Sequence, residues 1–214
     1  MNKTKFSQEF IARYRWVLAS QSPRRRLLLS EAGFCFDVIS ASDAAEDGIR
    51  ANETPGEFVA RQAYQKANDV AGQLRRGEIA FDNSRPTIII GCDTVAVCEG
   101  EILGKPSDMA DARRMLQRLG GNRHEALSGL CLLNVTSGKT LIETDRTILS
   151  MRPWDEASLE IYLALRHWEG KAGAFGYQDG IDWLEIVEGS ESNVVGLPLE
   201  LLARMIGEMK NEEF

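Results

Sequence analysis

The sequence predicts an α/β fold in which helices flank a mixed β-sheet. Short apolar runs rich in β-branched residues alternate along the chain with helical patterns, which is typical of strands joined by crossover helices. Two further strand-like runs, 125–134 and 140–150, flank a Ser137-Gly138 turn and predict a hairpin. The chain has 214 residues, of which 43% are hydrophobic, enough for one sizeable core or two closely joined lobes.

The expected elements follow in chain order. We expect a strand at 16–19, a helix at 23–31, a strand at 34–39 and a polar, acidic loop at 40–56. A helix at 54–70 and a polar connection at 75–86 come next, followed by strand residues at 87–91 and 95–97 and a turn at 99–100. The remaining elements are a helix at 108–119, the hairpin, a helix at 156–165, a glycine-rich segment at 170–180, a strand at 181–187 and a closing helix at 198–209.

Capping residues indicate where the first two helices begin. Ser22 is a candidate N-cap, and Pro23 suits the first helical position. Thr54 and Glu57 have the spacing of a capping box, with Pro55 between them at the first position.

Composition excludes several classes of protein. The net charge is −7 and the pI is about 5.0, which argues against a general nucleic-acid binder. The four cysteines form no C-x-x-C pair and there are two histidines, so we expect free thiols in a reducing cytosol rather than zinc or disulfides. No run is long enough to cross a bilayer. Residues 1–15 lack the apolar stretch of a signal peptide, and we expect an N-terminal extension followed by a single cytoplasmic domain at 16–214.

The most informative segment is the turn after the first expected strand, where Arg24, Arg25 and Arg26 fall in the first turn of a helix. The helix macrodipole is positive at this end, so arginines there are unfavourable unless an anion offsets them. Free backbone N–H groups and guanidinium groups together favour a phosphate site. A solvated basic turn with no ligand explains the three arginines equally well.

Asp93 follows the apolar run 88–91, at the carboxyl end of an expected buried strand. Ligands of open α/β sheets bind at that end, and Asp93 is a candidate to hold a divalent cation or to polarise water. The equal alternative is an aspartate that caps a turn through Thr94.

Other candidates are weaker individually. Lys105 lies between glycine and proline, Lys171 and Gln178 belong to the glycine-rich segment, and Glu46 is in the acidic loop. Their alternatives are plain surface turns and solvated loops, and Lys66 taken alone reads as a solvated helical lysine. Together, cations beside a strand-end carboxylate suit phosphoanhydride chemistry.

These segments resemble the Maf family of nucleoside triphosphate pyrophosphatases. The matching pieces, in the family's order, are 18–25, 65–67, 91–95, 104–106, 171–178 and 194–198. The resemblance implies a Maf/ITPase-like fold with two lobes around a central nucleotide-binding cleft, and a homodimer. From the composition we expect neither nucleic acid nor a membrane as a partner. The resemblance further implies hydrolysis of a nucleoside triphosphate to the monophosphate and pyrophosphate with Mg²⁺ or Mn²⁺, for house-cleaning of the nucleotide pool.

Carried over by position, the resemblance also implies roles. Asp93 becomes the catalytic carboxylate and a metal ligand. The residues implied to bind the substrate are Ser22, Arg24, Arg25, Lys66, Ser128, Lys171 and Gln178, and Lys105 is implied to neutralise phosphate at the catalytic centre. Glu46 is the best match to the family's loop carboxylate and second metal ligand, with Asp47 and Asp43 as alternatives.

The chain departs from the family at Ser128, where threonine is usual, and at Tyr177, where isoleucine is common. The Ser-Pro-Arg-Arg, Asp-Thr and Gln-containing segments favour the branch that acts on dTTP and UTP. Three alternatives stay open: a pyrophosphatase for 7-methyl-GTP or other modified nucleotides, a non-catalytic nucleotide-binding regulator of septum formation or division, and a phosphatase that releases inorganic phosphate.

Overall fold

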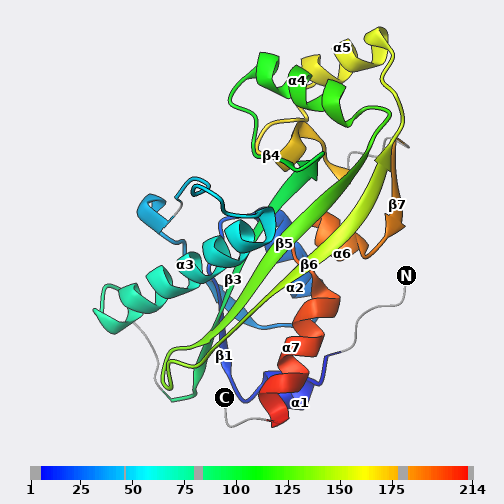
Figure 1. Cartoon of the computed structure of the whole chain (residues 1–214). Helices are drawn as coiled ribbons and strands as arrows, with labels where there is room; N and C mark the ends of the chain where they lie inside the picture. Colours follow the sequence, from blue (N-terminus) through cyan, green and yellow to red (C-terminus); the bar gives the residue numbers. More distant parts are fainter. Residues whose placement is uncertain (1–5, 46, 80–83, 178–182, 212–214) are drawn as a thin grey trace. The chain divides into compact units, whose positions relative to one another are not determined.

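The computed structural model describes residues 6–45, 47–79, 84–177 and 183–211. Its centre is a seven-stranded mixed sheet in the order β2-β1-β3-β5-β6-β7, with β4 paired to β3 (Figure 1). The strands are β1 (Arg15–Leu18), β2 (Phe36–Val38), β3 (Thr87–Cys98), β4 (Glu101–Leu103), β5 (Arg123–Asn134), β6 (Thr140–Met151) and β7 (Leu184–Glu188). β1 is parallel to β2 and β3, whereas β4 and β7 are antiparallel to their neighbours, which confirms the predicted mixed α/β fold.

The helices are α1 (Gln8–Ile11), α2 (Pro23–Glu31), α3 (Pro55–Arg75), α4 (Met109–Leu119), α5 (Glu156–Ala164), α6 (Glu191–Val195) and α7 (Leu199–Asn211), with short 3₁₀ turns η1 (Asp43–Ala45) and η2 (Ala172–Ala174). Among the described residues, none of these helices is long and apolar enough to span a membrane.

The chain divides into two compact units. Unit 1 contains residues 1–93, 128–145 and 196–214, and unit 2 contains residues 94–127 and 146–195. The strands β3, β5 and β6 contribute residues to both units, so no linker of distinct composition marks the boundary in the sequence.

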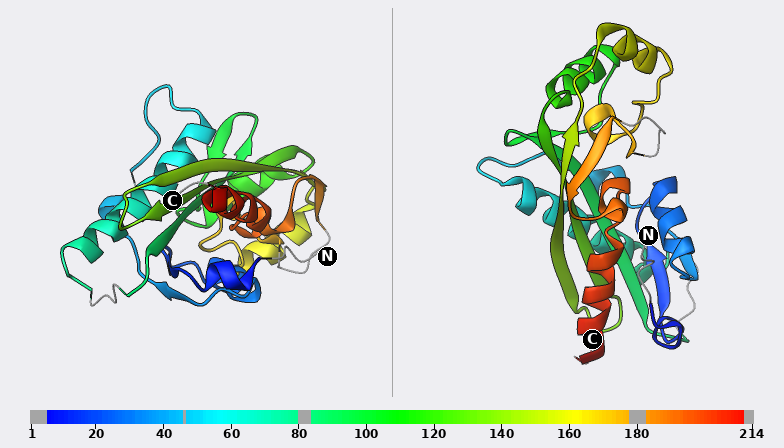
Figure 2. Two further views of the ribbon diagram at one scale, coloured as in Figure 1. Left: turned by 90° about the horizontal axis from the view of Figure 1, so that it is seen from below. Right: turned by 90° about the vertical axis from the view of Figure 1, so that its right-hand side faces the viewer.

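Unit 1 has a core on each face of its part of the sheet, because side chains alternate along a strand. Figure 2 shows α7 on one face and α3 on the other. The face toward α7 buries Trp16, Leu18, Ile88, Ile90, Leu130 and Leu132 against Leu201, Leu202, Met205 and Ile206. The face toward α3 buries Val17, Ala19, Ile89, Cys131 and Leu133 against Ala63, Ala67, Val70 and Ala71. Phe10 and Ile11, from the expected N-terminal extension, are buried in the first of these cores.

Unit 2 has its own core between α4, α5 and the residues around η2. Aromatic rings supply much of it: Trp154 stacks on Trp183 at a centroid distance of 4.7 Å, and Tyr162 stacks on Phe175 at 5.3 Å. Such ring pairs add stability beyond the apolar area that they bury.

Two glycines set the close packing of α3 on the sheet. A Cβ on Gly91 of β3 would lie 2.1 Å from the carbonyl oxygen of Ala63, and a Cβ on Gly129 of β5 would lie 2.1 Å from that of Val59. Both contacts involve backbone atoms, which cannot move away as a flexible side chain can. Any larger residue would push the helix away from the strands.

We therefore expect Gly91→Ala to lower the free energy of unfolding by about 1–3 kcal/mol through overpacking. Gly56→Ala is the matched control, because Gly56 lies in α3 and a Cβ there would have no atom within 4 Å. The control should leave stability unchanged or raise it by up to about 1 kcal/mol. Urea denaturation measures both, and equal stabilities would contradict the close-packing account.

The buried His124 in β5 should make stability depend on pH. Burial in apolar surroundings lowers the pKa of His124 to about 4, against an ordinary 6.5. As the pH falls, the unfolded chain therefore binds a proton at this histidine before the folded chain does. The free energy of unfolding should fall by about 2–3 kcal/mol between pH 6.5 and pH 4. His124→Leu should lose this part of the pH dependence and the exposed His167→Leu should keep it, as thermal melts between pH 4 and 7 would show. Equal slopes in the two variants would contradict the assignment.

Candidate active site

The turn after β1 is fixed by its own side chains. Ser22 caps α2 by accepting a hydrogen bond from the Arg25 backbone N–H, and Pro23 occupies the first helical position, as predicted. The Ser20 hydroxyl accepts from the Ser22 backbone N–H at 3.2 Å and from the Arg25 guanidinium at 3.1 Å. Because Ala19 donates its backbone N–H to the Ile90 carbonyl, this turn begins beside the part of β3 that belongs to unit 1.

The Gly196 carbonyl joins this turn to β3. It accepts from Arg25 Nε at 2.7 Å and from Cys92 Sγ at 3.3 Å. Gly196 has a φ of 119°, a backbone conformation that favours glycine. The sequence offered the segment 194–198 only as part of the resemblance, without a role. The structure shows that it positions Arg25 and the residue that precedes Asp93.

Asp93 forms an ion pair with Lys66. The ammonium of Lys66, on α3, lies 2.6 Å from Asp93 Oδ1, and the two side chains are 9% and 17% exposed. Two charges this far removed from water need each other, because either alone would carry a large desolvation cost. Lys66 is therefore no solvated helical lysine. It fixes a positive charge beside Asp93. The sequence predicted Asp93 at the carboxyl end of a strand, but the structure places it inside β3, which continues to Cys98.

The acidic loop lies on α3. Asp47 accepts a hydrogen bond from Gln65, and this bond, with help from Arg50 and Arg61, lowers the pKa of Asp47. Asp47 is thus engaged by α3, whereas Asp43 is exposed in η1. Glu46, the expected loop carboxylate, lies outside the described residues.

Ser128 is also in unit 1, where it is fully buried in β5. The predicted contact of Ser128 with substrate remains a prediction.

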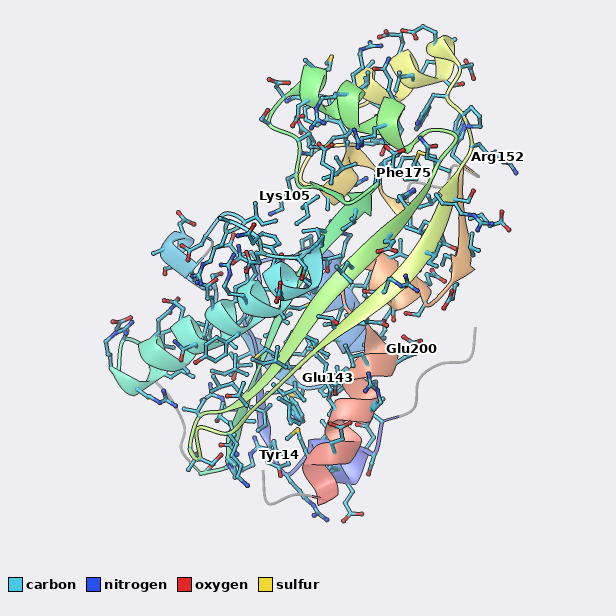
Figure 3. All side chains as sticks on the ribbon, in the orientation of Figure 1. Tyr14, Lys105, Glu143, Arg152, Phe175 and Glu200 are labelled. Atoms are coloured by element: carbon cyan, nitrogen blue, oxygen red, sulfur yellow. The ribbon has the colours of Figure 1, made fainter. Side chains whose placement is uncertain are left out.

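Two predicted cations belong to unit 2. Lys105 lies on the loop between β4 and α4 (Figure 3), and Lys171 directly precedes η2. Their two segments are joined, since Gly173 donates its backbone N–H to the Gly104 carbonyl at 3.0 Å. Gln178, predicted to contact substrate, lies outside the described residues.

In unit 1 the structure pairs Lys66 with Asp93 and holds Arg25, with Arg24 on the same helical turn of α2, to the Gly196 carbonyl that also accepts from Cys92. These residues of unit 1 provide the amino terminus of a helix, fixed cations and one carboxylate. Such a set can bind phosphate groups and accept a proton from water.

Comparison with known proteins agrees with this chemistry. The family model described as "Maf-like protein" matches residues 15–209. A dTTP/UTP pyrophosphatase of Rhodopirellula baltica is 46% identical over 191 residues, which cover 89% of this chain and 80% of the relative. A protein of the same name from Ruminiclostridium cellulolyticum is 37% identical, over 92% of this chain and 96% of the relative. Another, from Geotalea uraniireducens, is 40% identical, over 86% of this chain and 89% of the relative. With the family model spanning β1 to α7, the chain belongs to the Maf-like family.

Proposed function

We propose that this chain is a nucleotide pyrophosphatase that hydrolyses dTTP and UTP to the nucleoside monophosphate and pyrophosphate. The names of its relatives support the substrates. The observation that carries the chemistry is the ion pair between Lys66 of α3 and Asp93 inside β3, in the same unit as the basic turn after β1. Removing these nucleotides would serve as house-cleaning of the nucleotide pool.

Phosphate binding is the first task of the site. The amino terminus of α2 offers backbone N–H groups and the positive end of the helix dipole to an anion. Arg24 and Arg25 add guanidinium groups, and the contacts of Arg25 with Gly196 and Ser20 hold it in place before substrate arrives. Lys105 and Lys171 of unit 2 are proposed to neutralise phosphate charge, as the resemblance implies.

Asp93 is proposed as the base. Water attacks the α-phosphorus as Asp93 accepts one of its protons, a new P–O bond forms, and the bond from the α-phosphorus to the bridging oxygen breaks. The bridging oxygen leaves with pyrophosphate. Lys66 stabilises the negative charge that gathers around the reacting phosphate.

The donor set suits a metal that arrives with the substrate. Within the described ranges, no three histidine, cysteine or acidic residues are grouped closely enough to hold a metal ion by themselves. Mg²⁺ is usually held by one or two carboxylates together with substrate phosphates, and Asp93 supplies one such carboxylate. We propose Asp93 and Glu46 as the protein ligands for Mg²⁺ or Mn²⁺. When bound, the metal would neutralise phosphate charge and orient the pyrophosphate leaving group.

We also propose that the protein works in the cytoplasm as a homodimer. The four cysteines Cys35, Cys92, Cys98 and Cys131 are free thiols, which accords with a reducing compartment.

Removing the base should stop turnover without preventing binding. Asp93→Asn keeps the shape of the side chain but cannot accept the proton, so we expect kcat to fall by at least about 10²–10⁴-fold. Binding of a non-hydrolysable dTTP analogue, measured by calorimetry, should be retained. Full activity in this variant would remove Asp93 from the proposed role.

Lys66 should affect catalysis more than folding alone explains. Lys66→Met removes the ammonium that pairs with the Asp93 carboxylate, and we expect kcat/KM to fall by about 10²-fold or more. Lys66→Arg should restore part of the loss, since it keeps the charge. Lys139→Met, at an exposed position of the hairpin turn, is the control and should match the parent enzyme. Equal losses in the Lys66→Met and Lys139→Met variants would argue against a catalytic Lys66.

Substrate choice is tested with a panel of dTTP, UTP, CTP and 7-methyl-GTP in the presence of Mg²⁺. We expect monophosphate and pyrophosphate from dTTP and UTP, and loss of both products in Asp93→Asn. Product from 7-methyl-GTP alone would contradict dTTP and UTP as the substrates but would still support a pyrophosphatase reaction. Inorganic phosphate as the first product would indicate a phosphatase, and tight binding with no product would indicate a nucleotide sensor.

A further inference from the structure

Unit 2 contains a hollow with mainly apolar walls. About 410 Å³ of space lies between these walls, including the side that opens to solvent. Every residue that lines the hollow belongs to unit 2. Its polar lining residues are Thr94, His124, Glu125 and Tyr177. Sites for small molecules are typically of this kind, apolar hollows with a few polar groups.

The charge of the hollow argues against phosphate as its occupant. Among the described residues that line it, none is a lysine or an arginine, and Glu125 is an acid. His124 is uncharged at neutral pH, because burial lowers its pKa to about 4. A phosphate group would therefore meet a carboxylate in the wall and no cation. The hollow suits an uncharged part of a nucleotide.

Two segments that carry proposed site residues continue into the wall of this hollow. Thr94 directly follows Asp93 in β3, and Ala172 directly follows Lys171. In a nucleotide the sugar joins the base to the phosphates, so a site for the base is expected near the groups that bind phosphate. The place of the hollow along the chain therefore fits the base, which is the flat and uncharged part of dTTP or UTP.

Phe175 and Tyr177 both line the hollow, but their rings differ in what they contact. Phe175 (Figure 3) stacks on Tyr162 at a centroid distance of 5.3 Å and meets Trp154 edge to face at 6.0 Å. Tyr177 is half-buried, and with the residues that the structure describes its ring makes no aromatic contact and its hydroxyl no hydrogen bond. A half-buried ring without such partners is suited to stack on a flat ligand.

We propose that Tyr177 is a base-binding residue, whose ring stacks on the thymine or uracil of the substrate in this hollow. The inference rests on the proposed function, which supplies the nucleotide. Isoleucine is common at this position of the family, and its side chain has no ring to stack. The contact would therefore distinguish this chain from relatives that carry isoleucine.

The test separates the base from the phosphates by comparing two ligands. One is a non-hydrolysable dTTP analogue, and the other is inorganic triphosphate, which has the phosphate chain and no base. Calorimetry measures the Kd of each for the full-length protein without added metal. The variants are Tyr177→Ala, Tyr177→Ile and Tyr177→Phe. Tyr64→Ala is the matched control, because Tyr64 is an exposed tyrosine of α3.

Loss of the ring should weaken binding of the base alone. We expect the Kd of the dTTP analogue to rise by about 10-fold or more in Tyr177→Ala and Tyr177→Ile, because stacking on an aromatic ring is lost. It should stay near the parent value in Tyr177→Phe, which keeps the ring, and in Tyr64→Ala. The Kd of triphosphate should be the same in all of these proteins.

A spectroscopic measurement on the parent protein gives a second readout. The chain has four tyrosines, so ring-labelled tyrosine gives few NMR signals, and the signal that is missing from Tyr177→Phe belongs to Tyr177. We expect this signal to shift with the dTTP analogue and to stay in place with triphosphate. This readout needs no truncated side chain, so it decides the question even if Tyr177→Ala fails to fold.

An unchanged Kd of the dTTP analogue in Tyr177→Ala, or an equal rise for both ligands, would overturn the inference. A Tyr177 signal that does not respond to the analogue would overturn it as well. A parent that does not bind the analogue would refute the proposed function together with the inference. A parent that shows the base contact but releases no pyrophosphate from dTTP would refute the proposed reaction alone.

Discussion

The close contact between α3 and the strands β3 and β5 is the constraint on which unit 1 depends. Gly91 and Gly129 let the backbone of the helix lie against that of the strands, at a spacing that a Cβ on either would prevent. Helix and sheet then bury small residues such as Ala63 and Ala67 between them. The same contact brings Lys66 onto Asp93, so the packing that stabilises this face also assembles the charged pair of the site.

The site between the carboxyl end of β1 and the middle of β3 is preorganised. Arg25 is held by the Gly196 carbonyl and by Ser20, and the Gly196 carbonyl also binds the thiol of Cys92, next to Asp93. Fixed cations and dipoles are worth more to phosphoryl transfer than mobile ones, because they need no reorganisation as charge develops. On this account, α3 serves as the common support of three parts: the Lys66–Asp93 pair, the sheet and the acidic loop.

Local sequence signals predicted the elements well. Proline and capping residues located the starts of α2 and α3, and the Ser137-Gly138 turn identified the β5–β6 hairpin. The strand residues expected on either side of 92–94 proved to belong to one strand, β3, so Asp93 lies inside a strand rather than at the end of one. The short helices α1 and α6 were missed, since four or five residues carry too little periodicity to detect.

Contacts distant in the sequence could not be predicted from local patterns. Lys66 and Asp93 are 27 residues apart, and Arg25 and Gly196 are 171 residues apart. From the sequence alone Lys66 was interpreted as a solvated lysine, because its burial depends on the close packing that Gly91 and Gly129 allow between α3 and the sheet. The family resemblance supplied its role where local pattern did not. The hydrogen bonds that join the acidic loop to α3 had no signal in the sequence, because Arg61, Gln65 and Asp69 look like ordinary polar positions of an amphipathic helix.

The central claim is that water, activated at Asp93, attacks the α-phosphorus. It is tested most directly by a single turnover of dTTP in ¹⁸O-labelled water, followed by mass spectrometry of both products. The account predicts one labelled oxygen in the monophosphate and none in pyrophosphate. Label in the pyrophosphate would mean attack at the β-phosphorus and would contradict the account.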